Sequence, residues 1–300
     1  MQSAAWIVQN RPAMKRVILL NPRSGTALAR ETLDEALARA GCQADVVEAG
    51  GDVAAAARLA AERCDVLIAS GGDGTVSTVA AAAVEADRVF GVIPSGTLNH
   101  FARDARIPAD LDEALALILS GHTRLFDVGE INGRLFINNA SIGAYPRMVW
   151  ERNRARNAGL PRPLAMGFAV ARTWAGLRSM AVRVSVDGAV FVRRTPFIFV
   201  GNSEYEVEGT SLGTRQTMTD GTLALYMAPK FGRSDAVMLP WRVLRGTLAS
   251  HETFEAMTAS TISVETARRR VSAALDGEVH VFSPPLKFSV RRQALKVLAP

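Results

Sequence analysis

The chain has 300 residues, of which 48% are hydrophobic and 21% are charged. These values exclude a disordered chain, a collagen-like fibre and a disulfide-based scaffold, and the length suits one large domain or two ordinary ones. With 35 Lys and Arg against 29 Asp and Glu, the net charge of +6 favours an anionic partner. Nucleotide phosphate, anionic lipid and nucleic acid all qualify.

The sequence contains no run of apolar residues long enough to predict a membrane-spanning helix. Residues 1–16 lack the continuous apolar core of a signal peptide, so we expect a cytoplasmic protein. Cys42 and Cys64 are too few for a zinc site or a disulfide framework. We expect both to be reduced packing residues.

Alternating strands and helices are predicted for residues 17–125. Strands are expected at residues 17–20, 44–47, 65–69 and 89–93, and helices at 26–40, 53–63, 76–84 and 111–119. Gly41 suits the end of the first helix, and Asp52 suits the N-cap of the second. Because the strands are apolar along their whole length, we expect a parallel sheet that helices cover on both faces.

Short strands separated by turn residues are predicted after Gly121. Asn132-Gly133 and Asp187-Gly188 each predict a two-residue hairpin. Further strands are expected at residues 195–201, 222–227, 261–265, 271–275 and 286–291. This pattern predicts an antiparallel sandwich or barrel. The expected fold class is therefore α/β plus all-β, with an α/β domain at residues 1–123 and a β domain at residues 124–300, whose last strand is free to return to the first domain.

Basic and apolar residues are interleaved between Arg147 and Arg183, where eight arginines accompany a single acid, Glu151. Trp150 and Phe168 are among the apolar residues of this stretch. Such a mixture suits an anionic membrane surface. A solvated helical excursion between strands is the equally weighted alternative.

A glycine-rich turn directly follows the strand expected at residues 65–69. It reads Ser70-Gly-Gly-Asp73-Gly-Thr75 and precedes a predicted helix. Glycines let the backbone approach a ligand closely, and the N–H groups at a helix start attract phosphate. An aspartate in this place can reach a magnesium ion or a reacting hydroxyl. An ordinary strand-to-helix turn is the alternative, and the sequence is neither a Walker A loop nor a Rossmann fingerprint.

Two other predicted strands end in similar polar turns. Pro94-Ser-Gly96-Thr-Leu-Asn99 follows the strand at residues 89–93, with Arg103 shortly afterwards, and Asn21-Pro-Arg-Ser24-Gly follows the strand at residues 17–20. Arginine can clamp phosphate oxygens in a bidentate way. Because open α/β sheets bind ligands at the carboxyl ends of their strands, the three turns together predict a nucleotide site.

A fourth motif, Leu275-Asp-Gly-Glu278, lies in the predicted β domain. On local evidence it predicts a hairpin turn. Its order and separation relative to the other three motifs resemble the soluble bacterial diacylglycerol kinase and lipid kinase family, which is related to the sphingosine and ceramide kinases. The resemblance covers nearly the whole chain. The sequence GGDGT alone also occurs in NAD kinases and phosphofructokinases, so the combination of motifs carries the resemblance.

The resemblance implies an ATP-dependent lipid kinase that uses Mg²⁺, with an N-terminal α/β domain, a C-terminal β-sandwich and the site in the cleft between them. Asp276 is implied as the general base on the lipid hydroxyl, with Glu278 beside it and Asp73 in the nucleotide loop as a further catalytic acid. The residues implied at ATP are Asn21, Ser24, Gly71, Gly72, Asp73, Gly74, Thr75, Thr97, Asn99 and Arg103.

The resemblance also implies metal ligands. Asp220 matches the side-chain ligand of a structural magnesium site, to which Thr217 and Thr222 would offer carbonyls, and Asp127 matches a carboxylate near the active-site metal. The alternatives are an Asp-Gly turn at Asp220 and an aspartate at a strand start for Asp127. Two positions depart from the family pattern: His100 stands where many relatives have aspartate, and Thr26 stands where lysine is common.

Two other functions compete with that of a lipid kinase. The first is a kinase of a soluble acceptor such as NAD, although the later signature of NAD kinases is missing. The second is a non-catalytic nucleotide-binding module, which the presence of all three motif acids argues against. The expected partners are ATP and a lipid substrate at an anionic membrane surface, with peripheral membrane association and no nucleic acid. A homodimer is left open, and so is the choice of lipid.

Overall fold

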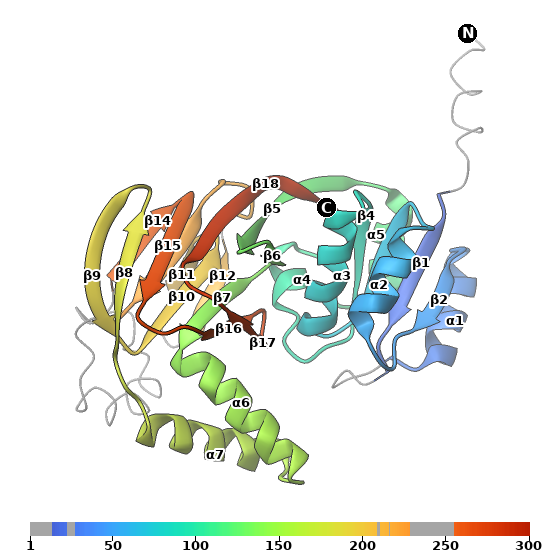
Figure 1. Ribbon diagram of the computed structural model, residues 1–300. Coiled ribbons are helices and arrows are strands. Elements are labelled where there is room, and N and C mark those ends of the chain that lie inside the picture. Colours follow the sequence, from blue (N-terminus) through green and yellow to red (C-terminus); the bar gives the residue numbers. More distant parts are fainter. Residues whose placement is uncertain (1–13, 23–27, 209–210, 216, 229–254) are drawn as a thin grey trace. The chain divides into compact units, whose positions relative to one another are not determined.

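The computed structural model describes residues 14–22, 28–208, 211–215, 217–228 and 255–300. The chain forms two compact units (Figure 1). Unit 1 comprises the chain up to Phe126 together with Ala294–Pro300, and unit 2 comprises Asp127–Gln293. The chain passes from one unit to the other within two strands, β5 (Thr123–Ile131) and β18 (Leu286–Leu298).

Unit 1 is built around a parallel sheet, as the apolar strands predict. Its strands lie in the order β2 (Asp45–Glu48), β1 (Arg16–Leu20), β3 (Val66–Gly71) and β4 (Val89–Pro94). The end of β18 adds a further parallel strand, because Val297 pairs with Phe90 of β4. The carboxyl ends of β1, β3 and β4 therefore lie at one edge of the sheet.

Helices follow the strands of unit 1 in turn. They are α1 (Arg30–Ala40), α2 (Val53–Ala61), α3 (Asp73–Glu85), α4 (His100–Asp104) and α5 (Leu111–Ser120). The two predicted helix boundaries are confirmed, since Asp52 Oδ1 accepts the N–H of Ala55 at 3.0 Å and Gly41 ends α1 with a φ of 62°. Only glycine adopts that backbone conformation without cost.

Apolar side chains cover both faces of the parallel sheet. Ile18 and Ile68 pack with Leu33 of α1 and Leu115 of α5 in one buried cluster. Because neighbouring side chains of a strand point to opposite faces, Val17, Leu19, Leu67 and Ala69, which are also fully buried, lie on the other face. The prediction of a sheet covered on both sides is confirmed.

Both cysteines belong to the interior of unit 1. Cys42 and Cys64 are buried and form no disulfide, and burial raises the pKa of both thiols. They are therefore packing residues, as expected. Within the ranges that the structure describes, no helix combines the length and apolar composition needed to cross a bilayer.

Unit 2 contains two antiparallel sheets. The first has the order β18, β15 (Thr261–Thr266), β8 (Met180–Val186) and β9 (Ala189–Thr195), and β5 forms a hairpin with β6 (Arg134–Phe136). The second has the order β14 (Glu255–Ala259), β13 (Leu223–Met227), β10 (Phe197–Asn202), β7 (Asn139–Gly143), β16 (Val271–Leu275) and β17 (Glu278–Phe282). Two short strands, β11 (Tyr205–Glu208) and β12 (Ser211–Arg215), pair with each other, and α6 (Ala144–Asn157) and α7 (Arg162–Ala175) follow β7.

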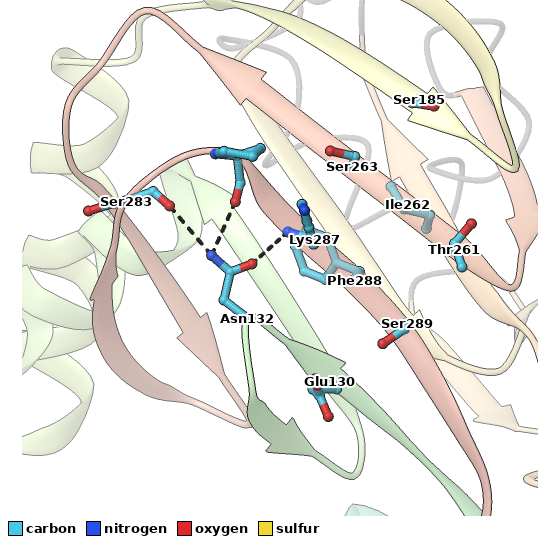
Figure 2. Close-up of a pocket in the computed structure, with 11 residues that line it drawn as sticks. Glu130, Asn132, Ser185, Thr261, Ile262, Ser263, Ser283, Lys287, Phe288 and Ser289 are labelled. Carbon is cyan, nitrogen blue, oxygen red and sulfur yellow. Dashed lines mark hydrogen bonds between the residues drawn. The ribbon is translucent and has the colours of Figure 1, made fainter.

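The predicted two-residue hairpins are present in unit 2. Asn132 and Gly133 have φ of 48° and 84°, and Asp187 and Gly188 have φ of 43° and 92°, as a turn with two positive φ values requires. The Asn132 side chain also anchors the next segment. It donates to the carbonyls of Ser283 and Pro285 and accepts the N–H of Lys287 at 2.7 Å (Figure 2).

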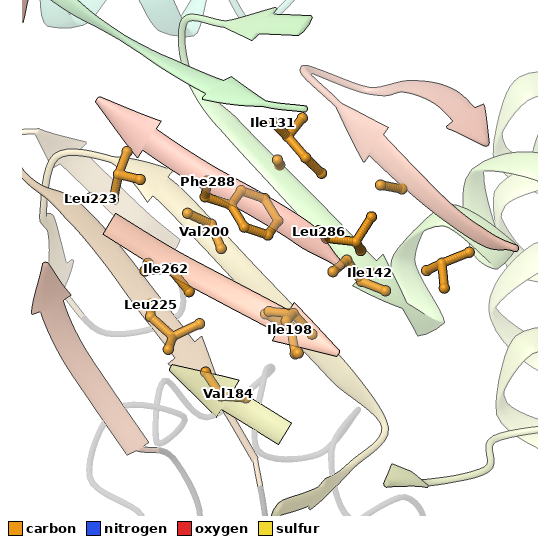
Figure 3. Close-up of a cluster of buried hydrophobic side chains, with 14 of the residues drawn as sticks. Ile131, Ile142, Val184, Ile198, Val200, Leu223, Leu225, Ile262, Leu286 and Phe288 are labelled. Atoms are coloured by element: carbon orange, nitrogen blue, oxygen red, sulfur yellow. The ribbon is translucent and has the colours of Figure 1, made fainter. Parts of the chain in front are cut away.

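The core of unit 2 lies between its two sheets (Figure 3). Val184, Ile262 and Phe288 come from the first sheet, and Ile198 and Leu225 come from the second. These side chains are at most 2% exposed, and they belong to one continuous apolar cluster. The arrangement is the predicted antiparallel sandwich.

The side chain of Asp187 joins its hairpin turn to the start of β15 in unit 2. Its carboxylate accepts the backbone N–H groups of Thr261 (2.9 Å) and Ser260 (3.2 Å) and both of their hydroxyls. The Thr261 N–H is the main cause that lowers the pKa of Asp187 from its ordinary 3.8. A lowered pKa stabilises the fold above the unfolded-state value, and the effect is lost as the pH falls through the folded-state value.

We therefore expect Asp187→Asn to lower the urea midpoint at pH 7. The deficit relative to the wild type should shrink as the pH falls below about 4, where the aspartate of the unfolded chain becomes protonated. Unfolding curves followed by circular dichroism at a series of pH values measure it. A deficit of constant size at every pH would contradict this account.

Candidate functional site

Three turns meet at the carboxyl edge of the parallel sheet in unit 1. Asn21, after β1, donates its backbone N–H to Ser70 O at 2.9 Å and its side-chain amide to Thr75 Oγ1 at 2.8 Å. The N–H of Ser95, after β4, reaches Gly71 O at 3.3 Å. The three predicted motifs of this unit are thus brought together by hydrogen bonds.

Glycines allow the turns after β3 and β4 to touch through their backbones. A Cβ added to Gly96 would lie 2.5 Å from the Cα of Gly72 and 2.7 Å from Asn99 Oδ1. A Cβ on Gly71 would lie 2.7 Å from the Thr75 side chain. Contacts this short do not occur, so Gly96 is required by the close approach of the two turns and Gly71 by the packing of Thr75 against its own turn.

Asp73 is the first residue of α3, which begins three residues earlier than the predicted Val76. The glycine content of the motif suggested a longer turn, but Gly74 is accommodated in the first helical turn. Asp73 Oδ1 accepts the N–H of His100 at 2.8 Å, so the first residue of one helix is tied to the first residue of the next. A carboxylate at a helix start is also favoured by the helix dipole.

Asn99 shapes its own turn. It has a φ of 49°, its Oδ1 accepts the N–H of Gly96 at 3.0 Å, and its Nδ2 donates to Gly96 O at 2.9 Å. Thr97 and Arg103 are exposed, and Arg103 Nη2 lies 3.3 Å from His100 Nδ1. Ser24, which was also expected at the nucleotide, lies outside the described residues.

The Asp-Gly turn between β16 and β17 is both a hairpin turn and an anchored carboxylate. Asp276 and Gly277 have φ of 46° and 89°. Asp276 Oδ1 accepts the N–H groups of Asn138 (2.8 Å) and Asn139 (2.9 Å), and Oδ2 accepts the N–H of Ile137 (2.8 Å). Three N–H donors stabilise the ionised carboxylate and fix its position.

Titratable groups surround this turn. The Glu278 side chain is 59% exposed, and its Oε2 lies 4.0 Å from His280 Nε2. Partial loss of hydration raises the pKa of Glu278, and the charge of Asp276 raises it further. Burial, followed by the charge of Arg134, lowers the pKa of His280. Protonation of Glu278 therefore becomes easier.

The sequence did not identify the buried polar residues behind the segment that holds Asp276. They are Asn138, Asn202 and Arg215, which are at most 5% exposed, and the partly buried Tyr205. Arg215 donates to Ile137 O at 2.7 Å and to Asn138 Oδ1 at 2.9 Å. These residues belong to no common motif, because four different segments supply them.

The predicted metal ligands of unit 2 make other contacts. Asp127 is 3% exposed, and its two oxygens accept the N–H groups of Gly221 and Gln293, each at 2.7 Å. Asp220 Oδ1 accepts the Ser203 hydroxyl at 2.9 Å and the N–H of Thr222 at 3.4 Å. Thr217 Oγ1 accepts the N–H of Thr219 at 3.1 Å. Carboxylate oxygens that already accept N–H groups act as structural anchors and are less available to a cation. A metal at Asp127 or Asp220 therefore stays a prediction.

A shallow pocket of about 740 Å³ opens on the outer side of β8, β15 and β18 (Figure 2). Its lining includes the hydroxyls of Ser185, Ser263 and Ser289 and the side chain of Lys287. None of the predicted catalytic, nucleotide-binding or metal-binding residues lines this pocket. Among the described residues, no group of three or more His, Cys, Asp or Glu is arranged to hold a metal.

The arginine-rich stretch forms the two packed helices α6 and α7. Trp150 is 53% exposed and Leu164 is 63% exposed, and Phe168 is 44% exposed. Arg154 stacks over Trp150 at 5.5 Å, and Arg172 stacks over Phe168 at 5.8 Å. The exposed surface therefore combines aromatic rings with positive charge.

The architecture and the motif geometry agree with two family models. The diacylglycerol kinase catalytic domain matches residues 15–131, and the YegS C-terminal NAD kinase beta sandwich-like domain matches residues 143–299. The chain is thus a two-domain protein of the kind that these models describe.

Curated relatives identify the family directly. Diacylglycerol kinases of Staphylococcus aureus strains JH9 and Newman are each 31% identical to this chain over 242 residues, which cover 78% of this chain and 76% of the relative. The chain belongs to the diacylglycerol kinase family.

Solved structures share the fold. A putative diacylglycerol kinase from Bacillus anthracis str. Sterne has a TM-score of 0.74 at 22% identity and covers 97% of this chain and 99% of its own. A second structure of a diacylglycerol kinase from the same organism has a TM-score of 0.69 at 20% identity.

The backbone contact between Gly72 and Gly96 gives a prediction for ligand binding. We expect Gly96→Ala to weaken binding of the ATP analogue Mg·AMP-PNP about tenfold or more, because the methyl group forces the two turns apart at a cost of about 1–3 kcal/mol. Gly51→Ala is the matched control, since a Cβ at Gly51 meets no atom within 4 Å. Isothermal titration calorimetry gives both affinities. Equal affinities would mean that the turns do not form the nucleotide site.

Proposed function

We propose that this protein transfers the γ-phosphoryl group of ATP to the hydroxyl of a diacylglycerol-like or sphingoid lipid. The observation that carries the proposal is the 31% identity to diacylglycerol kinases over 78% of the chain. The anchored carboxylate of Asp276 and the glycine turns of unit 1 support it, because phosphoryl transfer requires a positioned base and a phosphate cradle.

The nucleotide phosphates are assigned to the start of α3. The first N–H groups of this 13-residue helix and the positive end of its dipole lie at the N-terminus, within the motif Gly71–Thr75. A phosphate bound there gains most from both. Thr97 is exposed on the neighbouring turn and Arg103 is exposed on α4, and they supply a hydroxyl and a guanidinium for phosphate oxygens.

Magnesium fits this site as a companion of the nucleotide. Mg²⁺ is commonly held by one or two carboxylates together with substrate phosphates, and Asp73 is a partly buried carboxylate that lies in the glycine turn. The ion would neutralise charge on the phosphates. His100 contributes its backbone N–H to Asp73, which keeps that carboxylate oriented whatever side chain residue 100 carries.

Asp276 is assigned as the general base for the lipid hydroxyl. Its three N–H donors hold it in one position. It can therefore accept a hydrogen bond from the lipid hydroxyl and take its proton while the oxygen–phosphorus bond forms and ADP leaves from the γ-phosphorus. Glu278, whose pKa is raised, provides a second carboxyl group next to it.

We expect Asp276→Asn to reduce kcat by about 10²–10⁴-fold while KM for ATP stays unchanged. The matched control is Asp187→Asn, because Asp187 occupies an equivalent Asp-Gly hairpin turn and also accepts backbone N–H groups with both oxygens. The assay measures transfer of ³²P from ATP to dioctanoylglycerol in mixed micelles. Label in a chloroform-soluble product supports a lipid acceptor. Label transferred only to a water-soluble product would refute it. A parallel loss of turnover and of ATP binding would refute the role of Asp276 as a base.

The surface of α6 and α7 is assigned to an anionic membrane. Trp150 and Phe168 offer rings for the interfacial region, and the arginines, two of which stack on these rings, offer charge to lipid phosphates. Glu151 is buried, and its Oε1 lies 3.8 Å from Arg172 Nε, so it does not present negative charge to the surface.

We expect Trp150→Ala to weaken binding to vesicles that contain phosphatidylglycerol about tenfold, or about 1.4 kcal/mol. Val192→Ala is the control, because Val192 is 67% exposed on β9, away from these helices in the sequence. Vesicle sedimentation provides the measurement, and high salt should weaken wild-type binding. Vesicle binding that does not change with salt concentration or with phosphatidylglycerol content would rule out this docking surface.

A further inference from the structure

Two of the peptide groups that donate to Asp276 also accept hydrogen bonds at their carbonyl oxygens. The peptide unit that joins Ile137 to Asn138 donates its N–H to Asp276 Oδ1 at 2.8 Å. The carbonyl of the same unit, Ile137 O, accepts Arg215 Nη1 at 2.7 Å and Asn202 Nδ2 at 3.1 Å. One rigid plane therefore connects a buried guanidinium to the carboxylate.

The next peptide unit repeats this arrangement. Asn139 donates its N–H to Asp276 Oδ1 at 2.9 Å. The carbonyl of this unit, Asn138 O, accepts the Tyr205 hydroxyl at 3.0 Å and the backbone N–H of Asn202 at 2.8 Å. Both peptide units whose N–H groups reach Oδ1 thus have donors on their carbonyl oxygens.

Donors on a peptide carbonyl strengthen the N–H of the same unit as a donor, because chains of hydrogen bonds polarise one another. The donor with a full charge is the most effective. Arg215 is 4% exposed, so its charge is poorly screened by water, and its field acts on the peptide unit that it contacts.

The site of Arg215 is built to keep the guanidinium in place. Nη1 also donates to Asn202 O at 3.1 Å, Nη2 donates to Asn138 Oδ1 at 2.9 Å, and the guanidinium carbon lies 5.8 Å from the centre of the Tyr205 ring. Burying an arginine is costly unless its donors are satisfied. An apolar residue would fill the space without that cost, which suggests that the charge itself is used.

We propose that Arg215, together with Tyr205 and Asn202, is a positioning group that fixes the orientation of the Asp276 carboxylate through the peptide units of residues 137–139. The inference rests on the role proposed above for Asp276. Arg215 acts through the backbone of another segment and is therefore a positioning residue.

The test compares Arg215→Met, Arg215→Lys and Tyr205→Phe with the wild type in the micelle assay. We expect Arg215→Met to lower kcat on the order of 10²-fold while KM for ATP is unchanged, because the carboxylate loses its fixed position. Arg215→Lys keeps the charge and should recover part of kcat. Tyr205→Phe removes one hydroxyl and should lower kcat about threefold to tenfold.

Guanidinium ion added at millimolar concentration should restore kcat of a further variant, Arg215→Ala, whose truncated side chain leaves room for the ion, and should not restore that of Arg215→Met. A residue with a purely structural role would not give this separation of kcat from KM together with chemical rescue. Arg193→Met is the matched control, because Arg193 also stacks on an aromatic ring of unit 2, Phe191, at 4.9 Å, and its kcat should equal that of the wild type.

The outcomes separate the two proposals. A wild type that phosphorylates no lipid refutes the proposed function. An active wild type with an inactive Asp276→Asn, but with full kcat in Arg215→Met and Tyr205→Phe, refutes the positioning role alone. If Arg215→Met does not fold, Tyr205→Phe decides: a fall in kcat at constant KM supports the positioning role, and an unchanged kcat overturns it.

Discussion

The carboxylate of Asp276 accepts hydrogen bonds from three successive backbone N–H groups, those of Ile137, Asn138 and Asn139. Residues more than 130 positions apart in the sequence are joined by this interaction. It requires an Asp-Gly turn with positive φ at one end and, at the other, the bend at residues 137–138, from which successive N–H groups point to one carboxylate. The second sheet of unit 2 provides both, because β16 pairs with β7, which begins at Asn139.

The same type of contact recurs in the described residues, and the surroundings of each aspartate decide its role. Asp73, Asp127, Asp187 and Asp276 each accept a backbone N–H from a distant segment. Asp127 is buried, with an N–H donor on each oxygen, so it serves as an anchor. Asp187 lies at the surface and also accepts hydroxyl groups, so its turn stabilises a strand connection. At Asp276, the buried Arg215 donates to the carbonyl of a peptide unit whose N–H group holds the carboxylate.

Local chemistry was sufficient to predict the fold class. The Asn132-Gly133 and Asp187-Gly188 hairpins and the N-cap at Asp52 follow from interactions within a few residues. The meeting of the turns at Asn21, Gly71 and Gly96 also follows from the sequence, because parallel strands end at one edge of a sheet. The start of α3 was predicted too late, because glycine favours turns on average while this helix tolerates Gly74 in its first turn.

The network behind Asp276 could not be predicted in the same way. Asn138, Asn202, Tyr205 and Arg215 share no spacing that a helix or a strand would make regular. Asn138 and Asn202 come together where β7 pairs with β10, and Tyr205 and Arg215 come together where β11 pairs with β12. A buried arginine has no distinct signature in a chain with 35 basic residues. The informative signal is energetic: a charge that is 4% exposed has to be satisfied, and here two carbonyls and an amide oxygen satisfy it.

Position 100 can carry different side chains because its contact with Asp73 is made by the backbone. The resemblance to lipid kinases implies an aspartate there, but the contact with Asp73 is made by the N–H of residue 100, which every residue except proline offers. The imidazole is directed instead to Arg103, 3.3 Å from Nδ1 to Nη2. Because a guanidinium can only donate, Nδ1 is the acceptor in this contact. A substitution that removes a carboxylate therefore leaves the geometry of the glycine turn intact and shifts the interaction of residue 100 toward a cation that is itself suited to phosphate.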